Sequence, residues 1–219
     1  MTRTKRVMDV CGSLVGLIAL APLFVLVGIA IAVDGRGGVA SVFFGQERVG
    51  RYGTSFRMWK FRTMVVGAER KGRQLTVGAD PRITRVGRWL RRFKLDELPQ
   101  LLNVLRGEMS LVGPRPEMPR FVALYSDAQR AVLDLVPGIT DPASIRYRDE
   151  ASELARAADP ENCYIEEIMP EKIRLNLQYA AHATPWSDVL VVLSTVGLLA
   201  GRHSSGGSTG KLTGSAIGA

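Results

Sequence analysis

Two adjacent carboxylates, Asp96 and Glu97, lie inside a strongly basic stretch of the sequence, flanked by Arg88, Arg91, Arg92, Lys94, Arg106 and Arg115. Nearby cations favour the ionised form of a carboxylate. Pro99 suits the first turn of a helix, whose N-terminus would add the same bias. An ionised Asp can attack phosphorus as a nucleophile, and an ionised Glu can help to hold Mg²⁺ together with substrate phosphates. An ordinary helix-start cap would give the same local pattern and stays an alternative.

The overall charge also points to an anionic partner. The chain of 219 residues has a formal net charge of +8, which implies nucleic acid, an anionic membrane surface or a phosphorylated substrate. Arginine suits a diphosphate, because its planar guanidinium matches phosphate oxygens. The two cysteines, Cys11 and Cys163, form no disulfide framework, and His182 and His203 give no zinc spacing with them.

Several elements must position the acid pair. Residues 42–64 alternate short apolar and aromatic runs with glycines, which predicts a β-hairpin or two short strands. A basic amphipathic helix follows, because apolar residues recur at helical spacing: Ile83, Val86, Trp89, Leu90 and Phe93. That helix suits a membrane interface, or equally a core contact with a solvated basic face. Pro99 opens the next helix, and Gly107 suits its C-terminal cap.

Three more helices are predicted from composition and spacing. Residues 65–74 are polar, and residues 170–183 have helical patterning. Residues 188–200 are apolar but too short to span a bilayer comfortably, so a buried or interfacial helix is expected. The Gly/Ser-rich tail, residues 201–219, is predicted to be disordered.

An uncharged run from Val10 to Val33 is long enough to cross a bilayer, which needs roughly 20 apolar residues. It is longer than the core of a signal peptide, which has about 7–15 apolar residues. Both of its flanks are basic, although positive charge favours the cytoplasmic side. A helix that breaks at Pro22 and returns on the same side removes this conflict. A straight span stays open on these residues alone.

Several longer sequence motifs of this chain resemble those of a known protein family. The run LDELPQLLNVLRGEMSLVGPRP, with WKFRTM upstream and PGIT downstream, closely resembles the bacterial sugar transferases, which are monotopic phosphoglycosyl transferases. The opening KRVMDV, followed by an apolar run with a central proline, is similar to them too. The resemblance extends from Lys5 to Gly138 and more weakly to Thr195.

The resemblance implies a mechanism and a location. Asp96 would attack the β-phosphorus of a UDP-sugar and release UMP, and undecaprenyl phosphate would then take the phosphosugar from Asp96. Glu97 would bind Mg²⁺, and Pro22 would mark the break of a re-entrant membrane helix. Residues near the phosphates would be Arg91, Arg115, and Lys60 and Arg62 of the KFRTM motif. Such enzymes start exopolysaccharide, capsule, lipopolysaccharide O-antigen or glycoprotein synthesis at the cytoplasmic face of the bacterial inner membrane.

The last third of the chain departs from the family pattern. The segment DPASIRYRDE, from Asp141, replaces a Gly-containing segment rich in Gln and Val, and Asn176 stands where many members carry Asp. Asn176, Arg146 and Arg148 could form a different pocket wall, or they could be ordinary surface residues.

Together these observations predict a mixed α/β fold, mostly helical, with a re-entrant membrane helix, interfacial amphipathic helices and a small β-hairpin. We expect an anchor over residues 1–35 and a catalytic domain over residues 36–200; homo-oligomerisation stays open.

A membrane-anchored module that binds anionic lipid is the main rival function, but it leaves the acid pair unexplained. An inactive relative is disfavoured by the intact Asp96, Glu97 and Arg115. Nucleic-acid binding is not expected, because the aromatic spacing fits strand packing: Phe43, Phe44, Phe56, Trp59 and Phe61.

Overall fold

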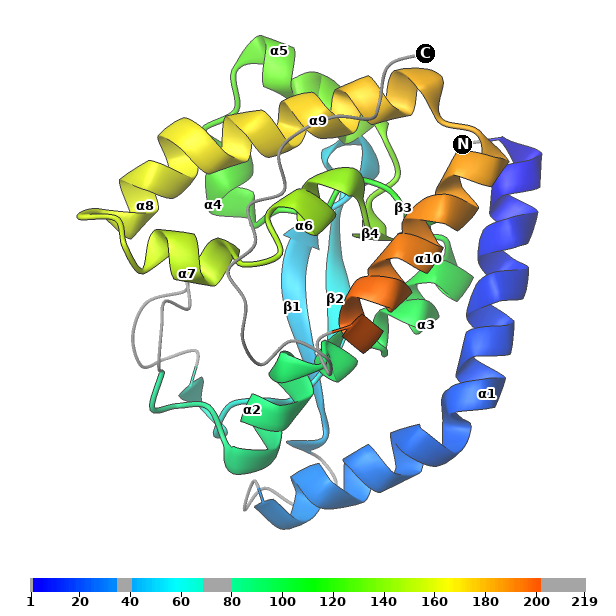
Figure 1. Ribbon diagram of the computed structural model, residues 1–219, viewed down its shortest axis with the longest axis vertical. Coiled ribbons are helices and arrows are strands. Elements are labelled where there is room, and N and C mark those ends of the chain that lie inside the picture. Colours follow the sequence, from blue (N-terminus) through cyan, green and yellow to red (C-terminus); the bar gives the residue numbers. More distant parts are fainter. Residues whose placement is uncertain (1, 35–40, 69–79, 202–219) are drawn as a thin grey trace.

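The computed structural model describes residues 2–34, 41–68 and 80–201, and its elements are mostly helical, as predicted (Figure 1). They include two small sheets, of which the sequence predicts the hairpin. Most of the expected helix over residues 65–74, and the tail after residue 201, lie outside the described residues. The elements are α1 (Arg3–Asp34), β1 (Phe43–Val49), β2 (Ser55–Phe61), α2 (Arg85–Arg92), η4 (Leu95–Glu97), α3 (Gln100–Arg106), β3 (Ser110–Val112), α4 (Pro119–Val122), α5 (Asp127–Arg130), β4 (Gly138–Thr140), α6 (Pro142–Arg146), α7 (Glu150–Leu154), α8 (Pro160–Cys163), η6 (Tyr164–Ile168), α9 (Met169–His182) and α10 (Pro185–Gly201).

Strands β1 and β2 form the predicted hairpin, paired antiparallel from Phe43 opposite Phe61 to Val49 opposite Ser55. Phe61 is buried and packs edge-on against Phe24 of α1, with ring centroids 5.1 Å apart. It also stacks on Phe43 at 5.4 Å. Phe61 therefore belongs to the hydrophobic core between the hairpin and α1, as its spacing in the strand predicts.

Strands β3 and β4 form a short parallel pair that fixes the start of the loop carrying Arg115. Ser110 lies opposite Gly138, and Val112 lies opposite Thr140. The two backbones approach so closely beyond β3 that a Cβ on Gly138 would lie 2.1 Å from the nitrogen of Gly113. Only glycine fits such an approach, which explains Gly113, the first residue of GPRP, and Gly138, the second residue of PGIT.

Helix α1 runs as one helix from Arg3 to Asp34, with Pro22, where the sequence predicts a break, inside it. Figure 1 instead shows a bend near the middle of α1, between its dark-blue first half and its lighter second half. Proline removes one helical hydrogen bond and crowds the carbonyl of the preceding turn, which bends a helix without necessarily ending it. By length and composition, α1 is the one described helix that could cross a membrane.

Both ends of α1 are bonded to the rest of the fold. Near its start, Arg6 donates Nη1 to the carbonyl oxygen of Val104 at 2.6 Å and Nη2 to that of Leu105 at 2.8 Å. At its end, the carboxylate of Asp34 accepts a hydrogen bond from the backbone N–H of Val86 at 2.9 Å. The two halves of α1 therefore lie against one folded body.

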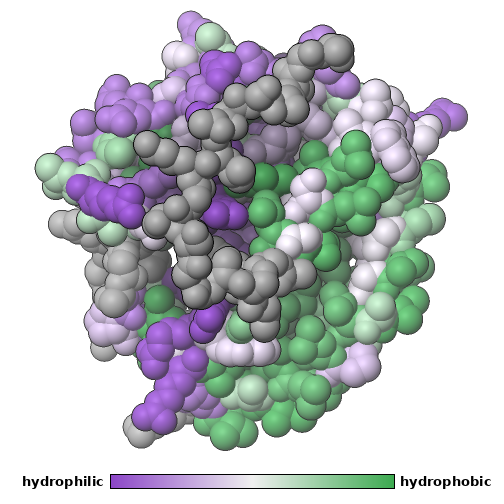
Figure 2. Space-filling view, in the orientation of Figure 1, coloured by the Kyte–Doolittle hydropathy of each residue, from purple (hydrophilic) through white to green (hydrophobic). Residues whose placement is uncertain are grey.

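Helix α10 starts next to the beginning of α1, diverges from it toward β3 and β4, and exposes apolar side chains (Figure 1). Lys5 of α1 pairs with Asp188 of α10 at 2.5 Å. The exposed apolar residues of α10 are Trp186, Leu190, Leu193 and Val196. Figure 2 shows hydrophobic residues gathered over α10 and α1, whereas the opposite side of the same view is mainly hydrophilic. The expected short apolar helix is therefore present, and it carries an exposed apolar face.

Candidate active site

The acid pair lies at a sharp change of chain direction between α2 and α3. Helix α2 ends at Arg92, and Lys94 adopts a left-handed conformation with φ 57°. Asp96 and Glu97 then form the short turn η4, and Pro99 caps the N-terminus of α3. Gly107 ends α3 with φ 86°. The predicted helix start at Pro99 and helix end at Gly107 are both confirmed.

Glu97 is the centre of a partly buried ion cluster. Arg115 donates Nη1 to Oε2 of Glu97 at 3.1 Å and Nη2 to Oε1, so that the pair is held at two points. Lys60 of β2 reaches Oε1 at 3.4 Å. Burial alone would raise the pKa of Glu97, but Arg115 and Lys60 outweigh it and hold that pKa well below its usual range. Glu97 is therefore an anion.

The cations of this cluster respond to the same surroundings. Burial lowers the pKa of Lys60 to about 8, although Glu97 opposes this shift. The carboxylate of Glu97 raises the pKa of Arg115 and outweighs its desolvation. Arg115 therefore stays charged, and it is locked in a defined orientation.

Asp96 differs from its neighbour. Its side chain is 7% exposed, and its Oδ1 is buried without a hydrogen-bond partner among the described residues. Burial, and then the charge of Glu97, raises the pKa of Asp96 despite the opposing cations Lys60 and Arg91. The basic neighbours do favour the ionised form of Asp96, as the sequence predicts, but burial and Glu97 raise its pKa by more than these cations lower it. Local charge in the sequence says nothing about desolvation. A buried carboxylate oxygen without a partner is unfavourable unless water, an ion or a ligand completes its bonding.

Of the two other predicted phosphate ligands, Arg91 lies near Asp96 and Arg62 points elsewhere. Arg91 donates Nε to Oγ1 of Thr63 at 2.8 Å. Burial lowers the pKa of Arg91, and the nearby carboxylate of Asp96 opposes this shift. Arg62 donates Nε to the carbonyl oxygen of Ser41 at 2.8 Å and lies over the ring of Phe44. The structure thus brings Lys60, Arg91 and Arg115 to the acid pair, while Arg62 supports the segment before β1.

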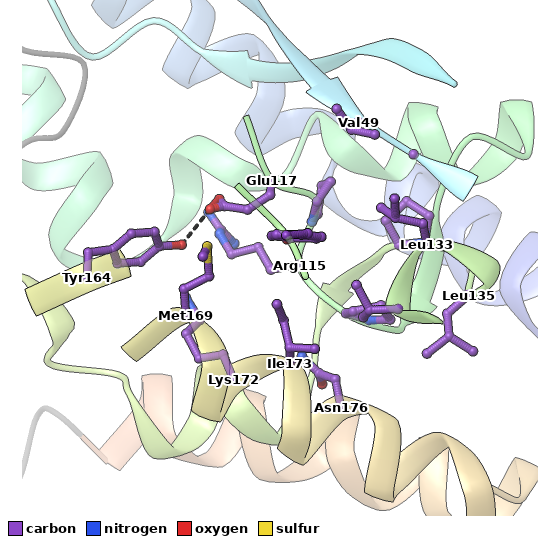
Figure 3. A pocket seen from close by; sticks show the side chains of 16 residues that line it. Val49, Arg115, Glu117, Leu133, Leu135, Tyr164, Met169, Lys172, Ile173 and Asn176 are labelled. Carbon is purple, nitrogen blue, oxygen red and sulfur yellow. Dashed lines mark hydrogen bonds between the residues drawn. The ribbon is translucent and has the colours of Figure 1, made fainter. Parts of the chain in front are cut away.

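The loop that presents Arg115 is held by residues that sequence patterns do not reveal. Arg48 of β1 donates to the carbonyl oxygen of Pro116 and to Oε1 of Glu117, both at 3.2 Å. Tyr164 donates its hydroxyl to Oε2 of Glu117 (Figure 3). Glu117 directly follows the GPRP motif and could have been suspected from that position. Arg48 and Tyr164 are distant from this motif in the sequence, and no motif or periodic pattern points to them.

A pocket of about 50 Å³ lies next to this loop and shares Arg115 with the ion cluster. Figure 3 shows Lys172, Ile173 and Asn176 of α9 opposite the segment that carries Arg115 and Glu117. Lys172 pairs with Glu150 at 2.8 Å. Asn176 therefore does form a pocket wall. Arg146 and Arg148 do not line this pocket, and Arg148 pairs with Asp149 at the surface.

The carboxylates can be tested against the donor set that Mg²⁺ needs. In the described ranges, no three His, Cys, Asp or Glu side chains gather to hold a metal ion. Mg²⁺ is commonly bound by one or two carboxylates together with substrate phosphates and water. The free Oδ1 of Asp96 and the anionic Glu97 fit that pattern, although three hydrogen bonds from cations already engage Glu97.

Comparison with known proteins agrees with this geometry. The family model described as bacterial sugar transferase matches residues 1–202. An undecaprenyl-phosphate glucose phosphotransferase from Komagataeibacter xylinus is 39% identical over 199 residues, which cover 88% of this chain and 35% of that protein.

Two other relatives are similar at comparable levels. The exopolysaccharide production protein ExoY of Sinorhizobium fredii is 40% identical over 71% of this chain and 74% of its own length. A UDP-N-acetylgalactosamine-undecaprenyl-phosphate N-acetylgalactosaminephosphotransferase from Aeromonas hydrophila is 34% identical over 88% of this chain and 42% of its own. The chain thus spans only about a third to three quarters of the length of these relatives. The family match covers the acid pair, its cations and both flanking helices, and this protein belongs to the bacterial sugar transferase family.

Proposed function

We propose that this protein transfers a sugar 1-phosphate from a UDP-sugar to undecaprenyl phosphate and releases UMP. The observation that carries the proposal is the environment of Asp96, whose free buried oxygen lies beside a Glu97 held by Arg115 and Lys60. Arg115 and Lys60 can offset the charge of a diphosphate, and the free oxygen of Asp96 can approach its phosphorus. The names of the relatives, which include a glucose and an N-acetylgalactosamine phosphotransferase acting with undecaprenyl phosphate, support this substrate class.

The chemistry would proceed in two displacements at one phosphorus atom. A carboxylate oxygen of Asp96 forms a bond to the β-phosphorus of the UDP-sugar, and the bond from that phosphorus to the bridging oxygen breaks. UMP leaves with the electron pair. An oxygen of undecaprenyl phosphate then attacks the same phosphorus, and the bond to Asp96 breaks, which restores the carboxylate. Such a covalent route predicts ping-pong kinetics.

The surrounding side chains would orient the diphosphate and offset its charge. Arg115 is locked by Glu97, and Arg91 by Thr63, so that both guanidinium groups are positioned before substrate arrives. Groups that need no reorganisation stabilise developing charge efficiently. Asp96 and Glu97 would hold Mg²⁺, which when bound supplies neutralisation of the charge on the departing phosphate.

We further propose that α1 enters and leaves the membrane on the cytoplasmic side. A straight membrane span would place its two ends on opposite sides of a hydrocarbon core about 30 Å thick. Arg6 near one end and Asp34 at the other both bond to the same folded body, which favours a re-entrant path with the bend at Pro22. Basic residues on both flanks favour the cytoplasmic side.

A labelled UDP-sugar panel tests the reaction. Membranes that contain the protein should release UMP from at least one UDP-sugar when undecaprenyl phosphate is added, and without the acceptor the protein should retain labelled phosphosugar. Asp96→Asn should abolish both signals, whereas the same change at the exposed Asp127 should leave them intact. Covalent label on Asp96→Asn would exclude Asp96 as the nucleophile. Two results together would favour the lipid-binding module instead. The unmodified protein would release no UMP from any UDP-sugar, and Asp96→Asn would bind anionic vesicles as well as the unmodified protein does.

Cysteine labelling tests the topology. In a background with Cys11 and Cys163 changed to serine, single cysteines are placed at Thr2 and Tyr52, both of which are exposed. An impermeant maleimide should label neither position in intact spheroplasts and both after lysis. Labelling of one position alone before lysis would indicate a straight span.

A further inference from the structure

Asn176 lines the pocket beside Arg115, and the residue as a whole is 6% exposed. Its two amide atoms keep some accessible surface, so they open onto the pocket and are not sealed in the core. Figure 3 shows Asn176 on α9, opposite the segment that carries Arg115. An accessible amide at a pocket wall is available to water or to a ligand. The pocket therefore offers a hydrogen-bonding group at the position of Asn176.

The other polar groups of this pocket already have partners. Glu117 is bonded to Arg48 and Tyr164, and Lys172 is paired with Glu150. These charges are therefore compensated within the protein. Asn176 is left as a neutral group that can both donate and accept, which matches a hydroxyl or an amide better than an anion.

The size of the pocket limits what it can hold. Its volume of about 50 Å³ compares with the roughly 10–15 Å³ of probe-occupied volume that one water molecule requires. It therefore accepts a group of a few heavy atoms, such as a hydroxymethyl or acetamido substituent. A whole nucleoside is too large for it.

Arg115 connects this pocket to the acid pair, because it lines the pocket and binds Glu97 beside Asp96. In a UDP-sugar, the group attached directly to the β-phosphorus is the sugar, whereas the uridine is one phosphate further away. A pocket that shares Arg115 is thus placed for the sugar.

We propose that the pocket between α9 and the loop of Arg115 receives a substituent of the transferred sugar, and that the side-chain amide of Asn176 hydrogen-bonds this substituent and so helps to select the sugar. This inference rests on the proposed transferase function. It assigns Asn176 as a specificity-determining residue, separate from the residues that act on the phosphates.

Replacing Asn176 by leucine tests the proposal with little change in volume. Because the amide opens onto the pocket, Asn176→Leu should shift the thermal unfolding midpoint by less than about 4 °C. For the preferred UDP-sugar, kcat/KM should fall about tenfold relative to the least preferred sugar of a panel of UDP-glucose, UDP-galactose and their N-acetylated amino forms. The inhibition constant of UDP, which carries no sugar, should stay within twofold. Gln178→Leu, at an exposed amide on the same helix, should leave all three readouts unchanged.

Several outcomes would overturn the inference. An equal fall in kcat/KM for every sugar, together with weaker inhibition by UDP, would assign the pocket to the nucleotide. A larger loss of thermal stability, repeated in Asn176→Ala, would show that the amide bonds within the fold. An unchanged order of kcat/KM across the UDP-sugars would show that the pocket does not contribute to sugar selectivity. If the unmodified protein releases no UMP from any UDP-sugar, the proposed function itself fails and the inference fails with it.

Discussion

The carboxylate of Asp9 in α1 accepts a hydrogen bond from the backbone N–H of Leu111 in β3, at 3.0 Å across 102 positions of sequence. Asp9 is 3% exposed, so this contact is part of the protein interior. Close packing accompanies it, because Gly12 faces Leu111 and Gly16 faces Leu101, with little space for a Cβ. Helix α1 is thus bonded to the strand that leads into the loop of Arg115, and it supports the site.

Replacing Asp9 by alanine should destabilise the protein by about 1–3 kcal/mol, because the N–H of Leu111 would be left buried without an acceptor. The measurement is the thermal unfolding midpoint of the detergent-solubilised protein. Asp127→Ala, at an exposed aspartate, provides the control and should change stability far less. An unaltered midpoint in the Asp9 variant would contradict the role given to this contact.

Glu97→Gln should reduce UMP release by at least about 100-fold, because it removes the anion that orients Arg115 and Lys60 and a proposed metal ligand. The fall should appear in kcat, measured at saturating UDP-sugar and Mg²⁺. Glu166→Gln, at an exposed glutamate in η6, is the matched control. Activity within a few fold of the unmodified protein would show that Glu97 is only a structural ion-pair partner.

Gly87→Ala should destabilise the fold by about 3 kcal/mol, although alanine is the better helix former. A Cβ at Gly87 would lie 2.0 Å from the carbonyl oxygen of Thr63, a backbone atom that cannot move aside easily. Gly197→Ala in α10 is the matched control, because no atom lies within 4 Å of that Cβ. Chemical denaturation should therefore show a lower free energy of unfolding for Gly87→Ala and an equal or higher one for Gly197→Ala. Equal free energies of unfolding in the two variants would contradict the close approach of α2 to Thr63.

Tyr164→Phe should lower stability by about 1–2 kcal/mol, because a buried hydroxyl bonded to the partly buried Glu117 is removed while Arg48 still pairs with that carboxylate. It should also raise KM for the UDP-sugar, since the loop of Arg115 loses one of its supports. Tyr52→Phe, at an exposed tyrosine in the hairpin turn, should change neither quantity. An unchanged KM in Tyr164→Phe would show that the hydrogen bond between Tyr164 and Glu117 does not affect substrate binding.

Lys5→Met should loosen α10 from α1, because Asp188 would keep only its hydrogen bond from the hydroxyl of Tyr179. Hydrogen–deuterium exchange within residues 185–198 should become faster, while exchange in α9 stays unchanged. Arg3→Met removes an exposed cation from the same segment and serves as the control. Equal protection of α10 in both variants would mean that its position does not depend on this ion pair.

The sequence by itself determined the local features of this protein. Periodicity and turn residues located the hairpin, the helices after Thr84 and Pro99, and the apolar N-terminal segment, because these depend on neighbours in the chain. Motif resemblance identified the family and the acid pair, since the residues that carry it are contiguous from Leu95 to Pro116. The proline in the apolar run marked where α1 changes direction, but not that the helix stays continuous there.

Only the tertiary structure decided the charges and partners at the site. Burial raises the pKa of Asp96 against its basic neighbours, and desolvation depends on atoms that arrive from distant segments. The same holds for Arg62, which is adjacent in sequence to core residues of the site but bonds to Ser41. Arg48 and Tyr164 support the loop of Arg115 because β1 and η6 both pack against it. Contacts across such sequence separations leave no periodic or local pattern, so they could not be predicted from the sequence.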